Sequence, residues 1–332
     1  MFRMILAFFL LICFTQASAL TLKIATISPD GTSWMKALRQ GAAEIKARTA
    51  GRVKIRFYPG GVMGSDRNVL RKIRFGQLQG GALTGGGLQQ IYFDSQIYSL
   101  PFAFRSLQEV DYVRAQMDPL IEKGLYQRGF ISFGLAEGGF AYLMSNRPIR
   151  ANKDLKGHKV WVPEGDTMSQ MAFKSAHISP VPLPLPDVLT GLQTGLIDTI
   201  GASTVGAIAL QWHTRVKYVT DTPLLYLYGI LIVKRQAFEK LAVPDQTVVR
   251  EIMSAVFRQL NRLNRDENAQ ARQALMDEGI RFVRPTPAAQ QNWEQLVAQL
   301  ISDVEKHGGR FLSSDMLHTL ITHLNAFRAR QL

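Results

Sequence analysis

The sequence contains a single cysteine, Cys13, in 332 residues. One thiol excludes a disulfide framework, and there are no paired cysteines to hold a metal. Cys13 also lies in an N-terminal segment that we predict to be removed as a signal peptide. The mature protein would then have no thiol, which makes an oxidising compartment tolerable and leaves stability to a packed core.

Long apolar runs are lacking outside the N-terminus. Residues 1–19 combine one positive charge, an apolar stretch over Ile5–Phe14 and a small-x-small site at Ala17–Ala19, which is typical of a secretory signal peptide. The stretch is shorter than the roughly 20 apolar residues that span a bilayer. We therefore predict a signal peptide at residues 1–19 and a periplasmic mature protein. The alternatives are a retained signal anchor and a lipidated Cys13, although Ile12 is bulky where lipidation requires a small residue.

Acidic residues are few beside basic ones, 26 against 39, and the formal charge is +13. In a cytosolic protein this charge would favour a nucleic-acid partner. The basic residues between positions 36 and 74 are scattered over expected helix surfaces and form no stripe interleaved with aromatic residues. We therefore predict no nucleic-acid partner. A solvated basic face is the preferred interpretation, and attraction to an anionic membrane or partner is the second.

Motifs for catalysis are also missing. The sequence has no His-Glu-x-x-His, no Gly-x-Ser-x-Gly and only dispersed histidines, so we predict no metal, no cofactor and no enzyme activity. Gly85-Gly86-Gly87 could cradle an anion through backbone N–H groups, but no Lys-Ser/Thr pair follows, which excludes a nucleotide-binding P-loop. A tight turn explains these glycines equally well. A secreted hydrolase using Ser203 and His213 is the alternative from another class of function.

Strands and helices alternate along the chain, which predicts an α/β fold. An amphipathic helix is expected from Asp245 to Glu278, about 50 Å long at 1.5 Å per residue, which is more than one lobe needs. Two further helices, Pro287–His307 and Ser314–Gln331, follow it. The predicted strands and extended segments are Leu22–Ile27, Val53–Tyr58, Gly81–Thr84, Lys159–Val162, Pro180–Leu185 and Asp198–Ile200.

Two α/β units of similar build predict two lobes. Phe140–Met144 and Tyr228–Val233 are apolar and extended where the chain would cross between them. The expected division places 20–140 and 228–268 in lobe I, and 141–227 and 269–332 in lobe II.

Several segments resemble the DctP-type substrate-binding proteins of TRAP transporters, in the same order and over nearly the whole mature chain. The matching segments are Phe57–Gly64 (Phe-Tyr-Pro-Gly-Gly-Val-Met-Gly), Ser99–Phe102 (Ser-Leu-Pro-Phe), Asp154–Val160 (Asp-Leu-Lys-Gly-His-Lys-Val) and Gly191–Asp198 (Gly-Leu-Gln-Thr-Gly-Leu-Ile-Asp).

The resemblance implies a two-lobed periplasmic binding protein fold with crossing strands and a long helix spanning both lobes. It also implies a small-molecule ligand held in the cleft and delivered to the membrane components of a TRAP transporter. Such a ligand must touch both lobes, because only a difference in affinity shifts the open–closed equilibrium. A receptor that presents its ligand to a sensor kinase is the alternative, and the sequence leaves monomer and dimer open.

The departures from the family pattern indicate a less polar cleft. An arginine on the strand after the Gly-x-Lys motif commonly clamps a ligand carboxylate in this family, and this chain has Trp161 there. Ala141 stands in place of a second arginine, and Gly201 and Ala202 replace frequent polar residues. Gly85–Leu88 likewise stand where polar pocket groups are common.

We therefore expect a ligand with apolar or aromatic surface, larger than a C4 dicarboxylate. The competing interpretation is that Trp161 is core packing and that an acid binds through backbone N–H groups or Lys159. Trp212 is expected to pack on the second lobe. The predicted ligand-binding residues are Trp161, Trp34, Gly85, Gly86, Leu88, Tyr142, Glu164 and Ser203.

Overall fold

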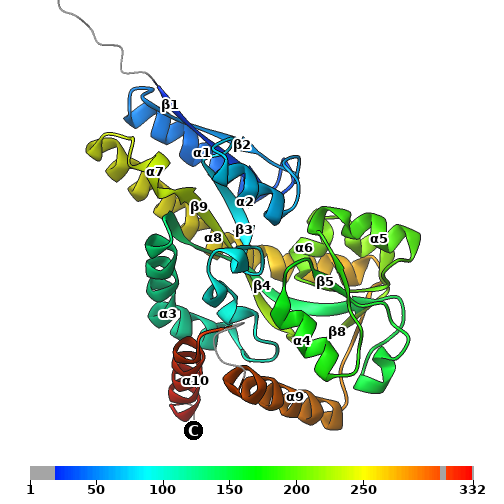
Figure 1. Ribbon diagram of the computed structural model, residues 1–332. Helices are drawn as coiled ribbons and strands as arrows, with labels where there is room; N and C mark the ends of the chain where they lie inside the picture. Colours follow the sequence, from blue (N-terminus) through cyan, green and yellow to red (C-terminus); the bar gives the residue numbers. More distant parts are fainter. Residues whose placement is uncertain (1–18, 307–311, 331–332) are drawn as a thin grey trace, which may run out of the picture.

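The computed structural model describes residues 19–306 and 312–330 (Figure 1). The predicted signal peptide, residues 1–19, lies outside the described residues except for Ala19. His307 and Gln331, the expected last residues of two C-terminal helices, also lie outside them. The described chain alternates strands and helices as predicted.

The strands largely match the predicted segments. Their bounds are β1 (Leu20–Thr26), β2 (Val53–Tyr58), β3 (Gly80–Thr84), β4 (Phe130–Ser145), β5 (Trp161–Pro163), β6 (Val181–Leu183), β7 (Thr199–Ala202), β8 (Tyr218–Thr220), β9 (Leu225–Lys234) and β10 (Arg281–Val283).

The helices surround the strands. The α-helices are α1 (Ser33–Arg48), α2 (Asp66–Arg74), α3 (Leu107–Gln127), α4 (Thr167–Ser175), α5 (Val188–Thr194), α6 (Thr204–Ala209), α7 (Arg235–Phe238), α8 (Val243–Asp277), α9 (Pro287–Lys306) and α10 (Ser314–Ala329). Short 3-10 turns are η1 (Gly87–Gln90), η2 (Phe93–Ser99), η3 (Asn152–Leu155), η4 (Leu185–Asp187) and η5 (Trp212–Arg215).

Side-chain caps set the starts of several helices. The Thr32 hydroxyl accepts a hydrogen bond from the Met35 N–H at the start of α1, and the Ser65 hydroxyl accepts one from Asn68 at the start of α2. Such oxygens satisfy N–H groups that have no partner inside the helix. At the other end of α5, Gly195 has a φ of 71°, the left-handed conformation that glycine adopts without strain.

The long strands β4 and β9 connect the two lobes. They pair antiparallel from Phe130 to Ala141 of β4, and beyond this pairing β4 also pairs with β7 and β8. On the other side, β9 pairs with β3, which leads to β1 and β2. In lobe I, β1 and β2 are parallel, as expected for strands joined by a helix. Strands β4 and β9 contain the predicted crossing segments.

Helices cover both faces of the lobe I sheet. One core packs α1 and α8 on the sheet, through residues such as Leu38 and Ile252. The other packs α2, α3 and the η2 turn on the opposite face, through residues such as Ile73 and Val113. Lobe II has its own cores around β5, β7, α5 and α6. Met168 of α4 belongs to the lobe I core that contains α2 and α3, so the two lobes are in contact at α4.

Helix α8 spans both lobes, as the sequence predicted. Its 35 residues correspond to about 52 Å at 1.5 Å per residue. Val249 and Ile252 belong to the lobe I core, whereas Leu275, near the other end, belongs to the core of lobe II. The helix therefore ties the two lobes along one side.

The C-terminal helix corrects one part of the predicted lobe division. Residues 269–332 were expected in lobe II, but α10 packs on α3, and Leu317, Leu320 and Leu324 are buried in a lobe I core. Arg328 also pairs with Glu109 of α3. An amphipathic sequence predicts that a helix buries one face but not which surface it covers. The remaining division stays a prediction.

Helix α9 lies along lobe II and reaches toward lobe I. It packs on α4, and the Trp293 ring stacks on Phe102, with 5.3 Å between centroids.

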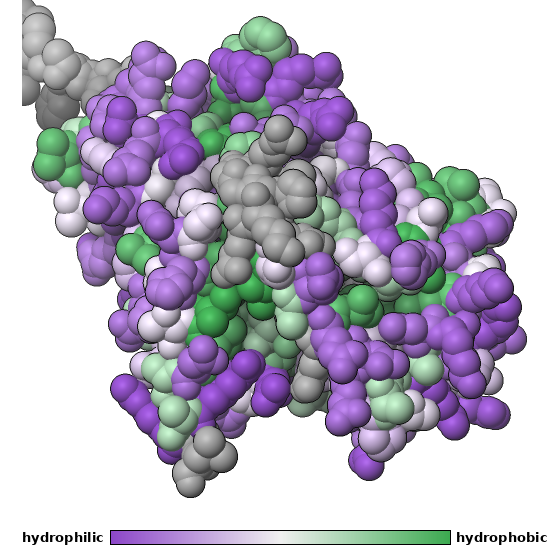
Figure 2. Space-filling model, turned by 60° about the horizontal axis from the view of Figure 1, so that its bottom comes forward, coloured by the Kyte–Doolittle hydropathy of each residue, from purple (hydrophilic) through white to green (hydrophobic). Residues whose placement is uncertain are grey.

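Hydrophilic residues dominate the face in Figure 2, and the largest group of apolar residues on it lies in a hollow near its middle.

Candidate ligand-binding cleft

A cavity of about 480 Å³ lies between the lobes. Lobe I lines it with the ends of β1 and β3 and the first turn of α1. Lobe II contributes β5, β7, α4 and α6, and the connecting elements β4, β9 and α8 contribute the rest. A guest in this cavity would touch both halves of the molecule.

Trp161 lies in the lobe II wall of the cavity. Its indole N–H donates a hydrogen bond to the Leu183 carbonyl at 3.1 Å, and its ring lies edge-to-face with Trp212 at 5.3 Å between centroids. Both indoles line the cavity while also packing on the lobe II core. The bond to Leu183 satisfies the only polar atom of the Trp161 side chain, which leaves an apolar ring surface facing the space.

Trp34 and Tyr228 line the lobe I side. Trp34 lies edge-on to Phe257 at 6.5 Å between centroids. The Tyr228 hydroxyl is buried and has no hydrogen-bond partner among the described residues. Sequence analysis assigned Tyr228 only to a crossing strand, because nothing in a strand pattern marks a hydroxyl that is left unpaired.

The two predicted glycines allow close contacts at the cavity edge. A Cβ added at Gly85 would lie 2.4 Å from the Tyr228 hydroxyl, and one at Gly86 would lie 3.3 Å from the Asp166 Cβ. Both glycines line the cavity. Gly85 makes room for a tyrosine, and Gly86 lets the two lobes approach each other.

Ser203 lines the cavity as the N-cap of α6. Its hydroxyl accepts a hydrogen bond from the Gly206 N–H at 3.2 Å. His213, its partner in the hydrolase alternative, instead lies 3.1 Å from the Ala207 carbonyl and 3.5 Å from Glu278. The structure therefore does not bring Ser203 and His213 together as a catalytic pair.

Three predicted site residues lie outside the main cavity. Leu88 is fully buried in a lobe I core. Tyr142 packs on the lobe II core, where burial raises its pKa, while its neighbour Ala141 faces the cavity. Successive side chains of a strand point to opposite faces, so only one of these two can line the cleft. Glu164 lines an adjoining hollow of about 330 Å³. We correct the predicted site by removing Leu88 and Tyr142 from it.

The cavity wall carries no cationic side chain among the described residues that line it, and it has two acidic ones, Asp166 and Glu267. Asp166 caps α4, accepting hydrogen bonds from the Ser169 N–H at 3.0 Å and the Ser169 hydroxyl at 2.7 Å. Burial raises the pKa of Asp166. Glu267 accepts a hydrogen bond from the Ser33 hydroxyl at 2.9 Å. Sequence analysis missed Glu267, because the helix pattern gives no sign that its side chain meets a cavity.

Lys159 lies away from the cavity wall. Its ammonium group donates to the Gly195 carbonyl at 2.8 Å, on an exposed part of lobe II. Lys159 is therefore not placed to bind an acidic ligand in this cavity, as the competing interpretation required.

The lobes touch at the rim of the cavity. Gln89 of η1 and Thr167 of α4 exchange hydrogen bonds of 2.7 and 3.0 Å across the gap. Arg67 and Glu164 face each other there at 3.8 Å. These contacts join the two lobes at the adjoining hollow.

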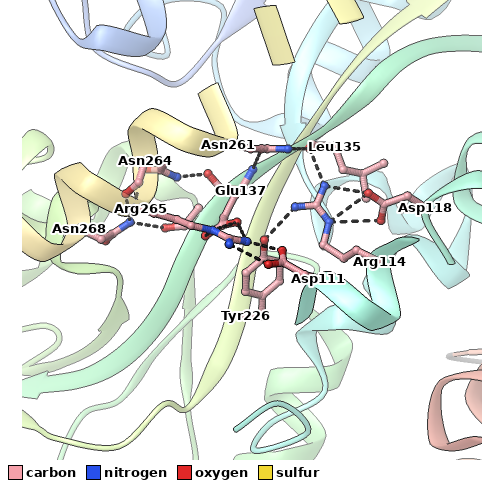
Figure 3. A network of polar contacts seen from close by, with 11 residues as sticks. Asp111, Arg114, Asp118, Leu135, Glu137, Tyr226, Asn261, Asn264, Arg265 and Asn268 are labelled. Atoms are coloured by element: carbon pink, nitrogen blue, oxygen red, sulfur yellow. Dashed lines mark hydrogen bonds and ion pairs between the residues drawn. The ribbon is translucent and has the colours of Figure 1, made fainter. Parts of the chain in front are cut away.

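A buried polar network joins α8 to β4 where the strands cross (Figure 3). The amides of Asn261, Asn264 and Asn268 bond to backbone groups of β4 between Leu135 and Gly138. Over this stretch β4 pairs with β9, and its pairing with β7 begins only at Tyr142, so the backbone groups on its other edge have no strand partner in the described chain. The asparagines serve as partners instead.

Arg265 is the charged centre of the network. Its guanidinium binds the Glu137 carboxylate, with Nη2 and Oε2 2.8 Å apart, and also contacts Asp111. These two carboxylates, Asp111 first, raise the pKa of Arg265. Glu137 is only 1% exposed at its side chain. The crossing strands are thus fixed to α8 by a buried ion pair.

The described residues contain neither a metal-ligating cluster nor a helix that could cross a membrane. Within 19–306 and 312–330, there is no group of three or more His, Cys, Asp or Glu side chains placed to hold a metal ion. None of the helices in these ranges has both the length and the apolar character that a bilayer crossing requires.

Comparison with known families shows which family the chain belongs to. The family model "Bacterial extracellular solute-binding protein, family 7", abbreviated DctP, matches residues 24–307. The chain belongs to this family. Members of the family are solute-binding receptors, and the resemblance seen in the sequence motifs is confirmed.

Individual relatives of the DctP family are distant. A Salmonella typhimurium protein named "Uncharacterized protein YiiZ" is 27% identical over 219 residues, which are 64% of this chain and 65% of that protein. The Bordetella pertussis receptor DctP7, solved with pyroglutamic acid, has a TM-score of 0.84 at 20% identity, covering 92% of this chain and 100% of that one. A TRAP periplasmic solute-binding protein from Shewanella oneidensis, solved with succinate, has a TM-score of 0.84 at 18% identity, covering 92% and 100%. These structures confirm the predicted two-lobed fold.

Proposed function

We propose that this DctP-family protein is a periplasmic receptor for a small organic ligand with substantial apolar or aromatic surface. The ligand is held between the lobes and delivered to the membrane components of a TRAP transporter. The proposed contact residues are Trp161, Trp34, Trp212, Tyr228, Gly85, Gly86 and Ser203.

The observation that carries this proposal is the replacement of a cation by an indole in the cavity wall. Trp161 stands where the sequence resemblance leads us to expect the family's arginine, and no Arg, Lys or His side chain is among the described residues that line the cavity. Pyroglutamic acid and succinate, found in the solved relatives, are acids. A simple dicarboxylate would enter this cavity without a counter-ion, and burying an unpaired charge is strongly unfavourable.

The apolar lining of the cavity as a whole can supply comparable binding energy by another route. A charge-assisted hydrogen bond contributes about 1.5–3 kcal/mol. Trp161 itself is 5% exposed, so most of the contact area comes from its apolar neighbours. If a ligand covers about 50–100 Å² of this lining, burial at about 25 cal/mol per Å² contributes about 1–2.5 kcal/mol. The exchange keeps affinity but changes the preferred ligand from an anion to an apolar surface.

The test is calorimetric titration of the mature protein, freed of copurified ligand, with 3-phenylpropan-1-ol and with succinate. We expect binding of the phenyl compound and none of succinate. Trp161→Ala, which removes an apolar part of the cavity wall, should weaken phenyl binding by at least about fivefold, the equivalent of about 1 kcal/mol. Trp161→Phe, which keeps an aromatic face, should weaken it by only about threefold.

A remote tryptophan provides the matched control. Trp293 stacks on Phe102 and does not line the cavity, so Trp293→Phe should leave the affinity unchanged. Tight succinate binding that persists in Trp161→Ala would reject the proposal.

A further inference from the structure

The acidic side chains in the cavity wall point to the charge of the ligand. We infer that the cleft is specific for an organic cation, an ammonium group on an apolar body, with Glu267 as its counter-ion. This inference rests on the proposed function, since it assigns a charge to the ligand that the apolar walls hold.

The first argument is that Glu267 is free to accept a second partner. Within the described part of the chain, the Ser33 hydroxyl is the only hydrogen-bond partner of the Glu267 carboxylate, and it contacts Oε2. Oε1 therefore remains available. Glu267 lines the cavity beside the first turn of α1, which also carries Trp34. A carboxylate and an aromatic face at one end of a cavity suit an ammonium group.

The second argument is that the walls hold aromatic rings without competing cations. Trp34, Trp161, Trp212 and Tyr228 all line the space. The faces of such rings attract cations, most strongly where water is excluded. Tyr228 is only 5% exposed, and its hydroxyl has no partner among the described residues, so a polar group in the wall is still unsatisfied.

Each helix start at the cavity already has one of its N–H groups bound by an oxygen of the protein itself. Thr32 caps α1 and Asp166 caps α4. At α6, Ser203 accepts from Gly206, and the Asn268 side chain accepts from the Val205 N–H at 3.3 Å. Backbone N–H groups at a helix start would otherwise attract a carboxylate. These caps leave an acid fewer backbone donors than uncapped helix starts would offer.

The overall charge of +13 does not contradict a cationic ligand. At physiological ionic strength, charges separated by more than about 8 Å of solvent are largely screened. The local charges of the cavity wall decide the preference instead, and these are negative. Arg67, at the adjoining hollow, faces Glu164 rather than the main cavity.

The experiment compares three probes with one apolar body: 3-phenylpropylammonium, 3-phenylpropan-1-ol and 3-phenylpropanoate. Calorimetric titration at physiological ionic strength, where the net charge of the protein is screened, should give the order ammonium, alcohol, carboxylate, with the ammonium bound at least about tenfold more tightly than the carboxylate. In Glu267→Gln, which keeps an acceptor for Ser33, the ammonium should lose its advantage over the alcohol, and alcohol binding should stay unchanged.

Asp266 provides the control for net charge. It is the exposed neighbour of Glu267 on α8 and does not line the cavity, so Asp266→Asn should leave all three affinities unchanged. Equal or tighter binding of the carboxylate would overturn the cation inference while leaving the apolar receptor intact. Failure of all three probes to bind would count against the proposed function, and the inference would fall with it.

Discussion

Replacing Arg265 by leucine should destabilise the protein by leaving a buried carboxylate without its cation. The Glu137 side chain is 1% exposed and receives Nε of Arg265 at 3.0–3.1 Å and Nη2 at 2.8 Å. Removing one partner of a buried ion pair costs about 3–5 kcal/mol. We expect about 3 kcal/mol, at the low end, because the Tyr226 hydroxyl remains beside Glu137 and the Arg265 side chain is 31% exposed.

The measurement is urea unfolding at pH 7.5, followed by circular dichroism. Replacing both partners, as in Arg265→Leu with Glu137→Leu, should restore most of the stability, because no charge then remains buried. Arg262→Leu, at an exposed position three residues earlier on α8, should change stability by less than about 0.5 kcal/mol.

The reasoning would be refuted if Arg265→Leu stayed within about 1 kcal/mol of the parent protein. It would also fail if the double variant were no more stable than the single one. Either result would mean that water, or another donor, satisfies Glu137 at the crossing of the lobes.

Three further predictions concern other parts of the molecule. The Asp245 carboxylate accepts hydrogen bonds from Arg52, which are the chief cause of its lowered pKa. It therefore stabilises the fold above its unfolded pKa. In urea unfolding, Asp245→Asn should cost about 1 kcal/mol at pH 7 and progressively less as the pH falls below about 4. Leu320→Ala should cost about 3 kcal/mol because α10 is part of the lobe I core, whereas the exposed His318→Ala should cost little; equal effects would contradict the placement of α10. Gln89→Ala removes the hydrogen bonds across the rim and should weaken 3-phenylpropan-1-ol binding by about threefold. The loss should come mainly from faster dissociation, measured by stopped flow. An unchanged dissociation rate would show that the rim contact does not hold the closed state.

Local patterns in the sequence determined the elements of this protein. Alternation in Val53–Tyr58 marks β2, and the caps at Thr32 and Ser65 mark the starts of two helices. The apolar repeat of α8 fixed both its length and its role in spanning the lobes. These features depend on side chains a few residues apart, which the sequence shows directly.

The departure from the family at Trp161 was also visible in the sequence, because a motif fixes the position at which an arginine is expected. The surroundings that the indole faces were not visible in the sequence. Strand period places Ala141 in the cleft and Tyr142 outside it, but the sequence does not say which of the two faces meets the cavity.

Tertiary structure alone decided the rest of the cleft. Leu88 lies in a core, Glu267 meets the cavity from the long helix, and α10 covers lobe I. Each of these depends on packing between segments far apart in the chain. A helical pattern states only that one face is buried, so it leaves open both the partner that buries that face and the polar side chain that ends beside a ligand.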